Sequence, residues 1–211
     1  MSFEERHAIS RSSSYPRRYR LQPDLERELI RKCKAGNTRF YEPLVKAYEP
    51  SGMSLAFALL GNIHDAQDAL QEAFTKAYRS LNQFDLTQSF SPWFFQILRN
   101  QCHDMLRSRK ADFSMETLDE RFELHSTDTE GEPEEMLQRN IAADTLWRGL
   151  QQISEEHREI IVLKEIQGFL YSEIASILNV PEGTVASRLY HARQALRDVL
   201  LNIGIEAKRS L

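Results

Sequence analysis

The sequence predicts an all-α protein, with two small helical domains joined by an acidic flexible linker and a helix-turn-helix in the second domain. Apolar residues recur at helical spacing in two separate stretches, 24–111 and 139–204. The segment between them, 112–138, has no sustained period and contains Gly131 and Pro133. It carries ten acidic residues against Arg121 alone. This composition is typical of a linker without a packed fold of its own.

Length and composition limit the class of protein. A chain of 211 residues with 41% hydrophobic residues can form one large or two small domains with a buried core. No apolar run approaches the roughly 20 residues that cross a bilayer, and the N-terminus lacks an apolar signal core. We therefore expect a soluble, cytoplasmic protein with no membrane insertion. Cys33 and Cys102 lie far apart on apolar helical faces and are expected to be reduced core residues, with no metal site and no cofactor.

The net charge of −4 has to be divided by segment before it says anything about partners. Residues 1–23 carry a net +3 and are predicted to form a mobile basic arm, which could touch phosphates or simply be an untethered tail. The net charge is +2 over residues 24–111, −9 over 112–138 and zero over 139–211. Because the acidity lies almost wholly in the linker, the net charge does not exclude nucleic-acid binding by either domain.

The first helices are delimited by capping and breaking residues. Asp24 is a good N-cap for a helix that ends at Gly36, and Asn37 can cap the next one. Pro50 and Gly52 interrupt the second pattern, so a kink or a break is expected there.

Residues 65–81 form a strongly patterned helix with a broad apolar stripe. Its N-terminal half gathers four acceptor side chains: Asp65, Asp68, Gln71 and Glu72. Acids near a helix N-terminus suit the helix dipole, which is one explanation. The other explanation is a docking surface for a basic partner.

A polar loop bounded by aromatic residues, 84–90, precedes the next helix, for which Ser91 and Pro92 are expected to be the N-cap and first helical residue. The helix combines an apolar stripe that includes Trp93 with cations and the amide of Asn100. Aromatic side chains beside a loop and a basic helix fit the capture of unstacked bases, although aromatic residues are more often core.

The second domain ends in a helix-turn-helix pattern over 171–197. Ser154 is expected to cap the preceding helix and Gly168 to end it. Two short helices are separated at Asn179-Val180-Pro181, and Val185 and Leu189 begin the buried stripe of the second helix. Its outward face carries hydroxyls and cations suited to the major groove: Thr184, Ser187, Arg188, His191 and Arg193. An ordinary helical hairpin with a solvated face is the alternative.

Three sequence blocks in this order resemble bacterial sigma factors of the extracytoplasmic-function (ECF) group. They are DAQDALQEAFTKAYRSL, then F-x5-F-x2-WFFQILRN, then PEGTVASRLYHARQALR. The resemblance covers nearly everything from Asp24 to Leu200. It implies two helical domains that bind core RNA polymerase, one opening the minus-ten promoter element and the other reading the minus-thirty-five element. It also admits an inhibitory anti-sigma factor, which the sequence does not identify.

The resemblance assigns residues to three surfaces. The polymerase-docking residues would be Asp65, Asp68, Gln71 and Glu72. The minus-ten surface would comprise Asp85, Leu86, Thr87, Gln88, Ser89, Phe90, Trp93 and Asn100. Positions at the minus-thirty-five major groove match Ser187, Arg188, Tyr190 and His191, and the outward face adds Thr184 and Arg193. The acidic linker would thread toward the active-site and RNA-exit path of polymerase, or act only as a spacer.

Some residues depart from the family pattern. Leu86 stands where glycine is usual and Pro92 where threonine is usual, so the loop and its base preference are expected to differ. Ala186 and His191 replace common basic residues, and Leu170 replaces a hydroxyl cap. The alternative function is a helix-turn-helix regulator that binds DNA without polymerase. No enzyme is predicted, because the sequence offers no carboxylate pair, nucleophile and base, glycine-rich phosphate loop or metal-ligand spacing.

Overall fold

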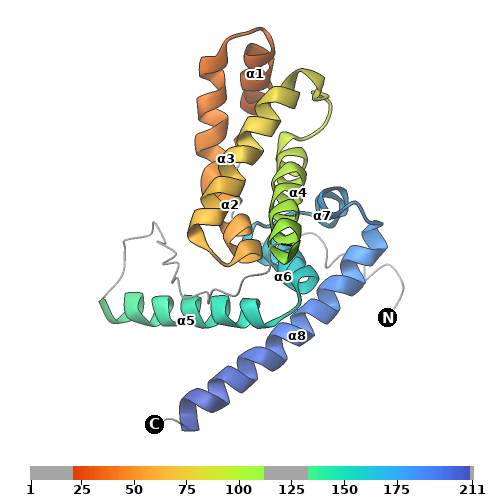
Figure 1. Cartoon of the computed structure of the whole chain (residues 1–211). Helices are drawn as coiled ribbons and strands as arrows, with labels where there is room; N and C mark the ends of the chain where they lie inside the picture. Colours follow the sequence, from red (N-terminus) through yellow and green to blue (C-terminus); the bar gives the residue numbers. More distant parts are fainter. Residues whose placement is uncertain (1–20, 112–132, 210–211) are drawn as a thin grey trace, which may run out of the picture.

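A computed structural model of the chain describes the backbone of residues 21–111 and 133–209 (Figure 1). Side chains are described for residues 21–109 and 143–204. These residues form helices and no strand, which confirms the predicted all-α class with two helical domains. The first domain contains α1 (Pro23–Lys34), a 3-10 turn (Thr38–Phe40), α2 (Tyr41–Leu60), α3 (Ile63–Ser80), a second 3-10 turn (Leu81–Gln83) and α4 (Phe90–Ala111). The second contains α5 (Pro133–Gln152), α6 (Glu155–Ile161), the π-helical turn η4 (Val162–Ile166), α7 (Tyr171–Leu178) and α8 (Glu182–Arg209).

The core of the first domain lies between α2, α3 and α4 and is rich in aromatic rings. Phe74 of α3 stacks on Phe94 of α4 with ring centroids 4.5 Å apart. Gly52 permits this close packing, because a Cβ atom there would lie 2.6 Å from Cδ1 of Leu70. Of the kink or break expected at Pro50, the break is wrong, because α2 runs without interruption from Tyr41 to Leu60; the kink stays a prediction. Tight tertiary packing around Gly52 offsets the loss of one helical hydrogen bond.

Several helix ends differ from the sequence prediction. Helix α1 begins at Pro23, so Asp24 lies in its first turn instead of capping it. Helix α4 begins at Phe90, which leaves Ser91 inside the helix with a buried hydroxyl. Asn62 is the N-cap of α3, and its side-chain oxygen accepts from the amide of Asp65 at 3.0 Å. These offsets of one or two residues are usual, because local signals define a helix end only approximately.

The second domain confirms the cap, the stop and the buried stripe that the sequence predicts. Ser154 accepts from the amide of His157 at 3.3 Å, and Gly168 has a φ of 69° where the helical segment ends. Helix α8 crosses α5 at Gly149, where a Cβ atom would lie 2.8 Å from Cδ2 of Leu200. Helix α5 begins at Pro133, within the stretch 112–138 that the sequence predicts to be linker. The remainder of the predicted linker, 112–132, and most of the basic arm, 1–20, lie outside the described residues.

The two domains also pack on one another, a contact that the sequence pattern does not predict. Helices α6 and α7 lie against α2 and α4 (Figure 1). The ring of Phe95 in α4 meets the ring of Phe169 edge-on at 5.0 Å. Among the described helices, none has the length and apolar character needed to cross a bilayer.

Candidate polymerase and nucleic-acid interfaces

The polar face of α3 borders a groove of about 700 Å³ between α2 and α3. Gln67, Asp68 and Gln71 are exposed at its edge, and Glu49 of α2 adds a further acceptor. The apolar lining comes from Tyr41, Val45, Met53, Leu70, Phe74 and Tyr78. Such a groove can receive a partner helix that carries both apolar side chains and cations.

Tyr41 helps to fix this groove. Its hydroxyl donates to the carbonyl of Phe74 at 2.7 Å, and its ring lies 5.0 Å from that of Tyr78. Burial raises the pKa of the Tyr41 phenol well above its ordinary value. Tyr41 therefore stays protonated and holds α2 against α3.

Two of the four predicted docking residues occupy other positions. Asp65 is paired with the guanidinium of Arg109 from α4, so its carboxylate is engaged within the domain. Glu72 is half-buried and does not line the groove. Glu49 was missed because the expected break at Pro50 separated it from the helix that faces α3.

The loop between the second 3-10 turn and α4 is shaped by its own side chains. The carboxylate of Asp85 accepts from the amide of Thr87 at 2.9 Å and from its hydroxyl at 2.8 Å. These bonds hold the pKa of Asp85 below its usual value, with the Thr87 amide as the largest cause. Lys34 donates to the carbonyl of Phe84 at 2.7 Å and ties the start of the loop to α1. Gln88 and Ser89 are exposed, while Leu86 packs partly into the core.

Aromatic rings support this loop from beneath. Phe90 is fully buried, and its ring lies 5.8 Å from that of Phe84 and 5.5 Å from that of Trp93. Its placement among DNA-contacting residues is therefore corrected: Phe90 supports the loop and cannot reach a base in this arrangement. Trp93 is only partly buried and lines a groove with Ser89 and Gln88.

Asn100 lies on the same face of α4 as Trp93, two turns along the helix. The amide side chain is exposed, so it can offer donors and an acceptor to a base edge. The structure thus brings the exposed loop residues, Trp93 and Asn100 onto one side of the first domain.

A tight turn at Asn179 and Val180 joins α7 to α8, the helix whose outward residues are predicted to read DNA. Asn179 adopts a left-handed conformation with a φ of 54°, and the amide of Val180 donates to the carbonyl of Ala175 at 3.0 Å. At the start of α7 the carboxylate of Glu173 accepts from the amide of Leu170 at 2.7 Å. Because leucine has no side-chain acceptor, only this half of a capping box is present, and it satisfies the amide of Leu170 but not the amides of the first turn.

Helix α8 turns its predicted stripe inward and its polar residues outward. Val185 and Leu189 are fully buried, as predicted. Ser187 and His191 are exposed, and the Tyr190 side chain is 61% exposed with its ring 5.4 Å from that of His191. Thr184 and Arg188 are half-buried beside them. Hydroxyl, phenol, imidazole and guanidinium groups therefore share one surface.

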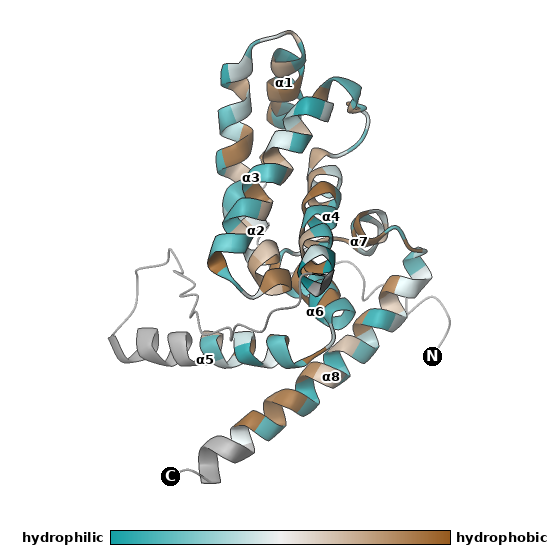
Figure 2. Cartoon of the chain, in the orientation of Figure 1, coloured by the Kyte–Doolittle hydropathy of each residue, from teal (hydrophilic) through white to brown (hydrophobic). Residues whose placement is uncertain are grey.

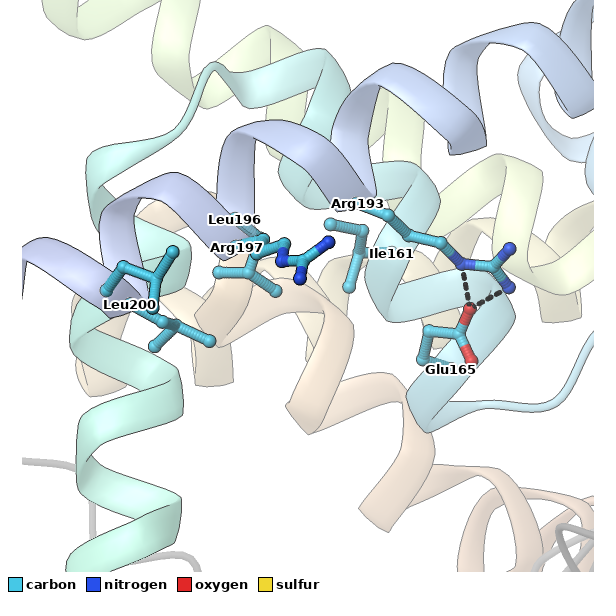
Figure 3. Close-up of a pocket in the computed structure, with 7 residues that line it drawn as sticks. Ile161, Glu165, Arg193, Leu196, Arg197 and Leu200 are labelled. Atoms are coloured by element: carbon cyan, nitrogen blue, oxygen red, sulfur yellow. Dashed lines mark hydrogen bonds and ion pairs between the residues drawn. The ribbon is translucent and has the colours of Figure 1, made fainter. Parts of the chain in front are cut away.

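Arg193 belongs to a different surface. Its Nε atom donates to Glu165 at 3.0 Å, beside a groove of about 450 Å³ that also involves Ile161 and Leu196 (Figure 3). The groove continues along α8 to Leu200 and Leu201, in a stretch where Figure 2 shows apolar residues among polar ones. The pair with Glu165 directs the guanidinium of Arg193 toward η4, and a contact of Arg193 with DNA stays a prediction.

Known proteins share this arrangement in both halves of the chain. Residues 44–111 match the family described as Sigma-70 region 2, and residues 143–196 match Sigma-70, region 4. The ECF RNA polymerase sigma factor SigW of Bacillus subtilis is 30% identical over 186 residues, which is 82% of this chain and 96% of SigW. This chain belongs to the ECF RNA polymerase sigma factors. The RNA polymerase sigma-H factor of Pseudomonas aeruginosa is 31% identical, over 89% of this chain and 100% of that protein.

Two solved structures have a similar fold. CnrH, solved in complex with the cytosolic domain of CnrY, has 25% identity and a TM-score of 0.59 over 83% of this chain and 97% of CnrH. RpoE of Bartonella quintana, solved with the anti-sigma factor NepR, has 23% identity and a TM-score of 0.61 over 76% of this chain and 96% of RpoE. As an ECF sigma factor, the chain binds core RNA polymerase and directs transcription initiation at promoters.

Proposed function

We propose that this sigma factor docks on core RNA polymerase through the groove between α2 and α3, opens the minus-ten element with the loop and α4, and reads the minus-thirty-five element with α8. The observation that carries the docking assignment is the groove itself. Asp68, Gln71 and Glu49 surround an apolar floor, so a helix with apolar and basic side chains would bury its apolar face while its cations meet the acceptors. The protein acts as a non-enzymatic initiation factor in the cytoplasm.

The docking assignment is tested by charge reversal. The Glu49→Lys, Asp68→Lys double variant, which reverses the two carboxylates that line the groove, should lose co-elution with core polymerase on a sizing column while its helicity stays unchanged. Asp24 and Glu28 are exposed acids on α1, so Asp24→Lys, Glu28→Lys provides a control with the same change of charge. Wild-type co-elution of the first variant would contradict the docking face. A wild-type chain that binds DNA but never polymerase would instead favour the helix-turn-helix regulator.

The minus-ten assignment depends on the surface formed by the exposed loop residues, Trp93 and Asn100. Unstacking a base costs a few kcal/mol, so a pocket on this surface must compensate for that cost. Asn100→Ala should therefore impair open-complex formation more than closed-complex binding. Permanganate footprints of the melted strand would measure this, with Asn202→Ala on exposed α8 as the matched control. Footprints equal to wild type in Asn100→Ala would remove Asn100 from the opening step.

The partners in this proposal are core RNA polymerase, promoter DNA and an anti-sigma factor. The solved structure of CnrH contains the cytosolic domain of CnrY, so a regulatory protein partner is proposed for this chain by similarity. Co-purification of the tagged chain from its own host, with and without polymerase depletion, tests for such a partner.

A further inference from the structure

Helix α1 contacts both ends of the loop that precedes α4. Nζ of Lys34 donates to the carbonyl of Phe84 at 2.7 Å, where the second 3-10 turn ends. A carboxylate oxygen of Glu26 accepts from the amide of Phe90 at 3.4 Å, where α4 begins. One helix, which belongs to none of the three surfaces in the proposed function, therefore holds the first and last residues of the segment 84–90.

Both bonds engage backbone groups that the neighbouring helices leave free. Phe90 is the first residue of α4, so its amide has no acceptor within that helix. A carboxylate at this position also suits the positive end of the helix dipole. Phe84 follows the 3-10 turn in an extended conformation, with a ψ of 129°, and its carbonyl accepts from Lys34 instead of from the turn. Helix α1 thus supplies the caps at both ends of the loop.

The carboxylate of Glu26 is fixed by a second buried group. Glu26 is 8% exposed, and its other oxygen accepts from the hydroxyl of Tyr48, which is 1% exposed. The ring of Tyr48 lies 5.4 Å from the ring of Phe90. Carboxylate, phenol and ring therefore enclose the start of α4. Because losing a donor to a buried carboxylate is costly, this arrangement resists movement of Phe90.

The spacing of the two anchors makes the loop bend outward. Eight residues separate Glu26 from Lys34, so their Cα atoms lie about 12 Å apart along α1 at about 1.5 Å per residue. The six peptide steps from Phe84 to Phe90 could span about 20 Å if the chain were extended. A segment whose ends are held closer together than its full length must turn away from the helix that holds them.

The middle of the loop has its own anchor, which leaves a short part exposed. Leu86, which stands where glycine is usual in the family, packs partly against the core. The carboxylate of Asp85 accepts from the amide and the hydroxyl of Thr87, and the amide of Gln88 donates to the carbonyl of Asp85 at 3.0 Å. The exposed residues that follow are Thr87, Gln88 and Ser89. Their path therefore depends on where the two ends of the loop are fixed.

We propose that Glu26 and Lys34 are positioning residues for promoter opening, which fix both ends of the loop and thereby determine which base the exposed residues 87–89 accept. Each acts through a backbone group of the loop, so neither side chain has to contact DNA. This inference rests on the proposed role of the loop at the minus-ten element. A contact that served only to stabilise the domain would change the folded fraction and leave the base preference of the folded molecules as it is.

The first experiment measures hydrogen exchange of the Phe90 and Gln88 amides by NMR in the free full-length chain. Glu26→Gln keeps the size of the side chain and removes its charge, so exchange at Phe90 should accelerate on the order of tenfold, as expected for loss of one charge-assisted hydrogen bond. Glu28→Gln is the matched control, because Glu28 lies on the same helix and pairs with Lys32 on its exposed side. Wild-type exchange at both amides in a folded Glu26→Gln would overturn the proposal.

The second experiment compares four promoters that differ only in the base to be unstacked at the minus-ten element, using reconstituted holoenzyme. Lys34→Met keeps a long side chain without a donor, so open-complex formation on the preferred promoter should fall about tenfold, with closed-complex binding unchanged and the base preference reduced. Lys34→Arg keeps a cationic donor and should restore both. Lys46→Met is the control, because Lys46 pairs with Glu42 on the exposed face of α2. Glu26→Gln is measured in parallel, so the result does not depend on how one variant folds.

Two results would overturn the proposal. One is an equal loss on all four promoters that follows the loss of stability in urea, which would make α1 a stabilising element only. The other is an unchanged base preference in well-folded Lys34→Met and Glu26→Gln. If wild-type holoenzyme showed no base preference at the minus-ten element, the proposed function of the loop would be rejected, whereas the exchange rates would still report whether α1 holds its ends.

Discussion

The two proposed DNA surfaces are built in opposite ways. The reading face of α8 is formed within one short segment, in which the left-handed Asn179 and the buried Val185 and Leu189 orient the outward side chains. The loop before α4 depends on distant parts of the chain. The amide of Phe90 donates to Glu26, 64 residues earlier, at 3.4 Å, and Lys34 holds the carbonyl of Phe84.

This difference predicts how each surface should respond to mutation. A surface built from local structure can lose an outward side chain without losing its shape. A surface supported by rings and a buried carboxylate from elsewhere should lose its shape when a supporting residue is removed. The three predictions below test this contrast, from the largest expected effect to the smallest.

The largest effect is expected from the pair Phe90→Ala and Tyr190→Ala, each of which removes an aromatic ring from one surface. Phe90 is fully buried, so its loss should destabilise the first domain by about 3–5 kcal/mol. Tyr190 is 61% exposed, so its loss should change stability by less than about 0.5 kcal/mol. Urea denaturation followed by circular dichroism measures both.

Phe90→Ala and Tyr190→Ala should also differ in the step of promoter binding that each one impairs. Phe90→Ala should weaken promoter opening because the loop loses its support, whereas Tyr190→Ala should affect only binding at the minus-thirty-five element. Equal destabilisation by the two substitutions would show that the contrast between the surfaces is wrong.

The contrast also explains what the sequence could predict. Val185 and Leu189 repeat at helical spacing, so periodicity alone identified the buried stripe of α8 and the polar face opposite it. For Phe90 no local pattern distinguishes a core ring from a base-stacking ring, since the decision depends on Glu26 and on rings that the fold brings together. The family resemblance indicated the correct surface but not which of its residues are accessible.

Ion pairs between side chains on different helical elements were also beyond the reach of the sequence pattern. Asp65 and Arg193 both lie on faces that the helical pattern marks as polar. The partners that engage them, Arg109 and Glu165, lie on other helical elements, and no spacing rule predicts such pairs. The contact between the domains was missed for the same reason, because it joins α4 to α6 and α7 across 60 residues of sequence.

A smaller effect is expected within the reading face, from Arg188→Ala compared with Arg193→Ala. If Arg188 contacts a base edge, its loss should cost about 1–3 kcal/mol of binding and relax specificity at that position. Arg193 pairs with Glu165, so its loss should leave sequence preference unchanged. Binding of reconstituted holoenzyme to a library of minus-thirty-five sequences would measure both.

The comparison would show whether the direction of each side chain, Arg188 outward and Arg193 toward Glu165, determines its contact with DNA. A uniform loss of affinity across sequences in Arg188→Ala would indicate a phosphate contact in place of a base contact. Relaxed specificity in Arg193→Ala would show that Arg193 contacts a base despite its pair with Glu165.

The smallest effect is expected from the turn that Asp85 and Thr87 form within the loop. Because hydrogen bonds from Thr87 lower the pKa of Asp85, the ionised carboxylate stabilises the turn. A lowered pKa in the folded state means that this stabilisation is present at pH values above the ordinary pKa of aspartate and is lost as the pH falls through the lowered pKa.

Thr87→Val removes the hydroxyl donor but keeps the amide, so the pKa of Asp85 should rise part of the way toward its ordinary value. NMR titration of the Asp85 carboxyl measures this, with Thr75→Val as a control, because the Thr75 hydroxyl bonds to Gln71 within α3. An unchanged titration of Asp85 in Thr87→Val would mean that the amide alone holds the turn, and the loop would then depend still more on Phe90 beneath it.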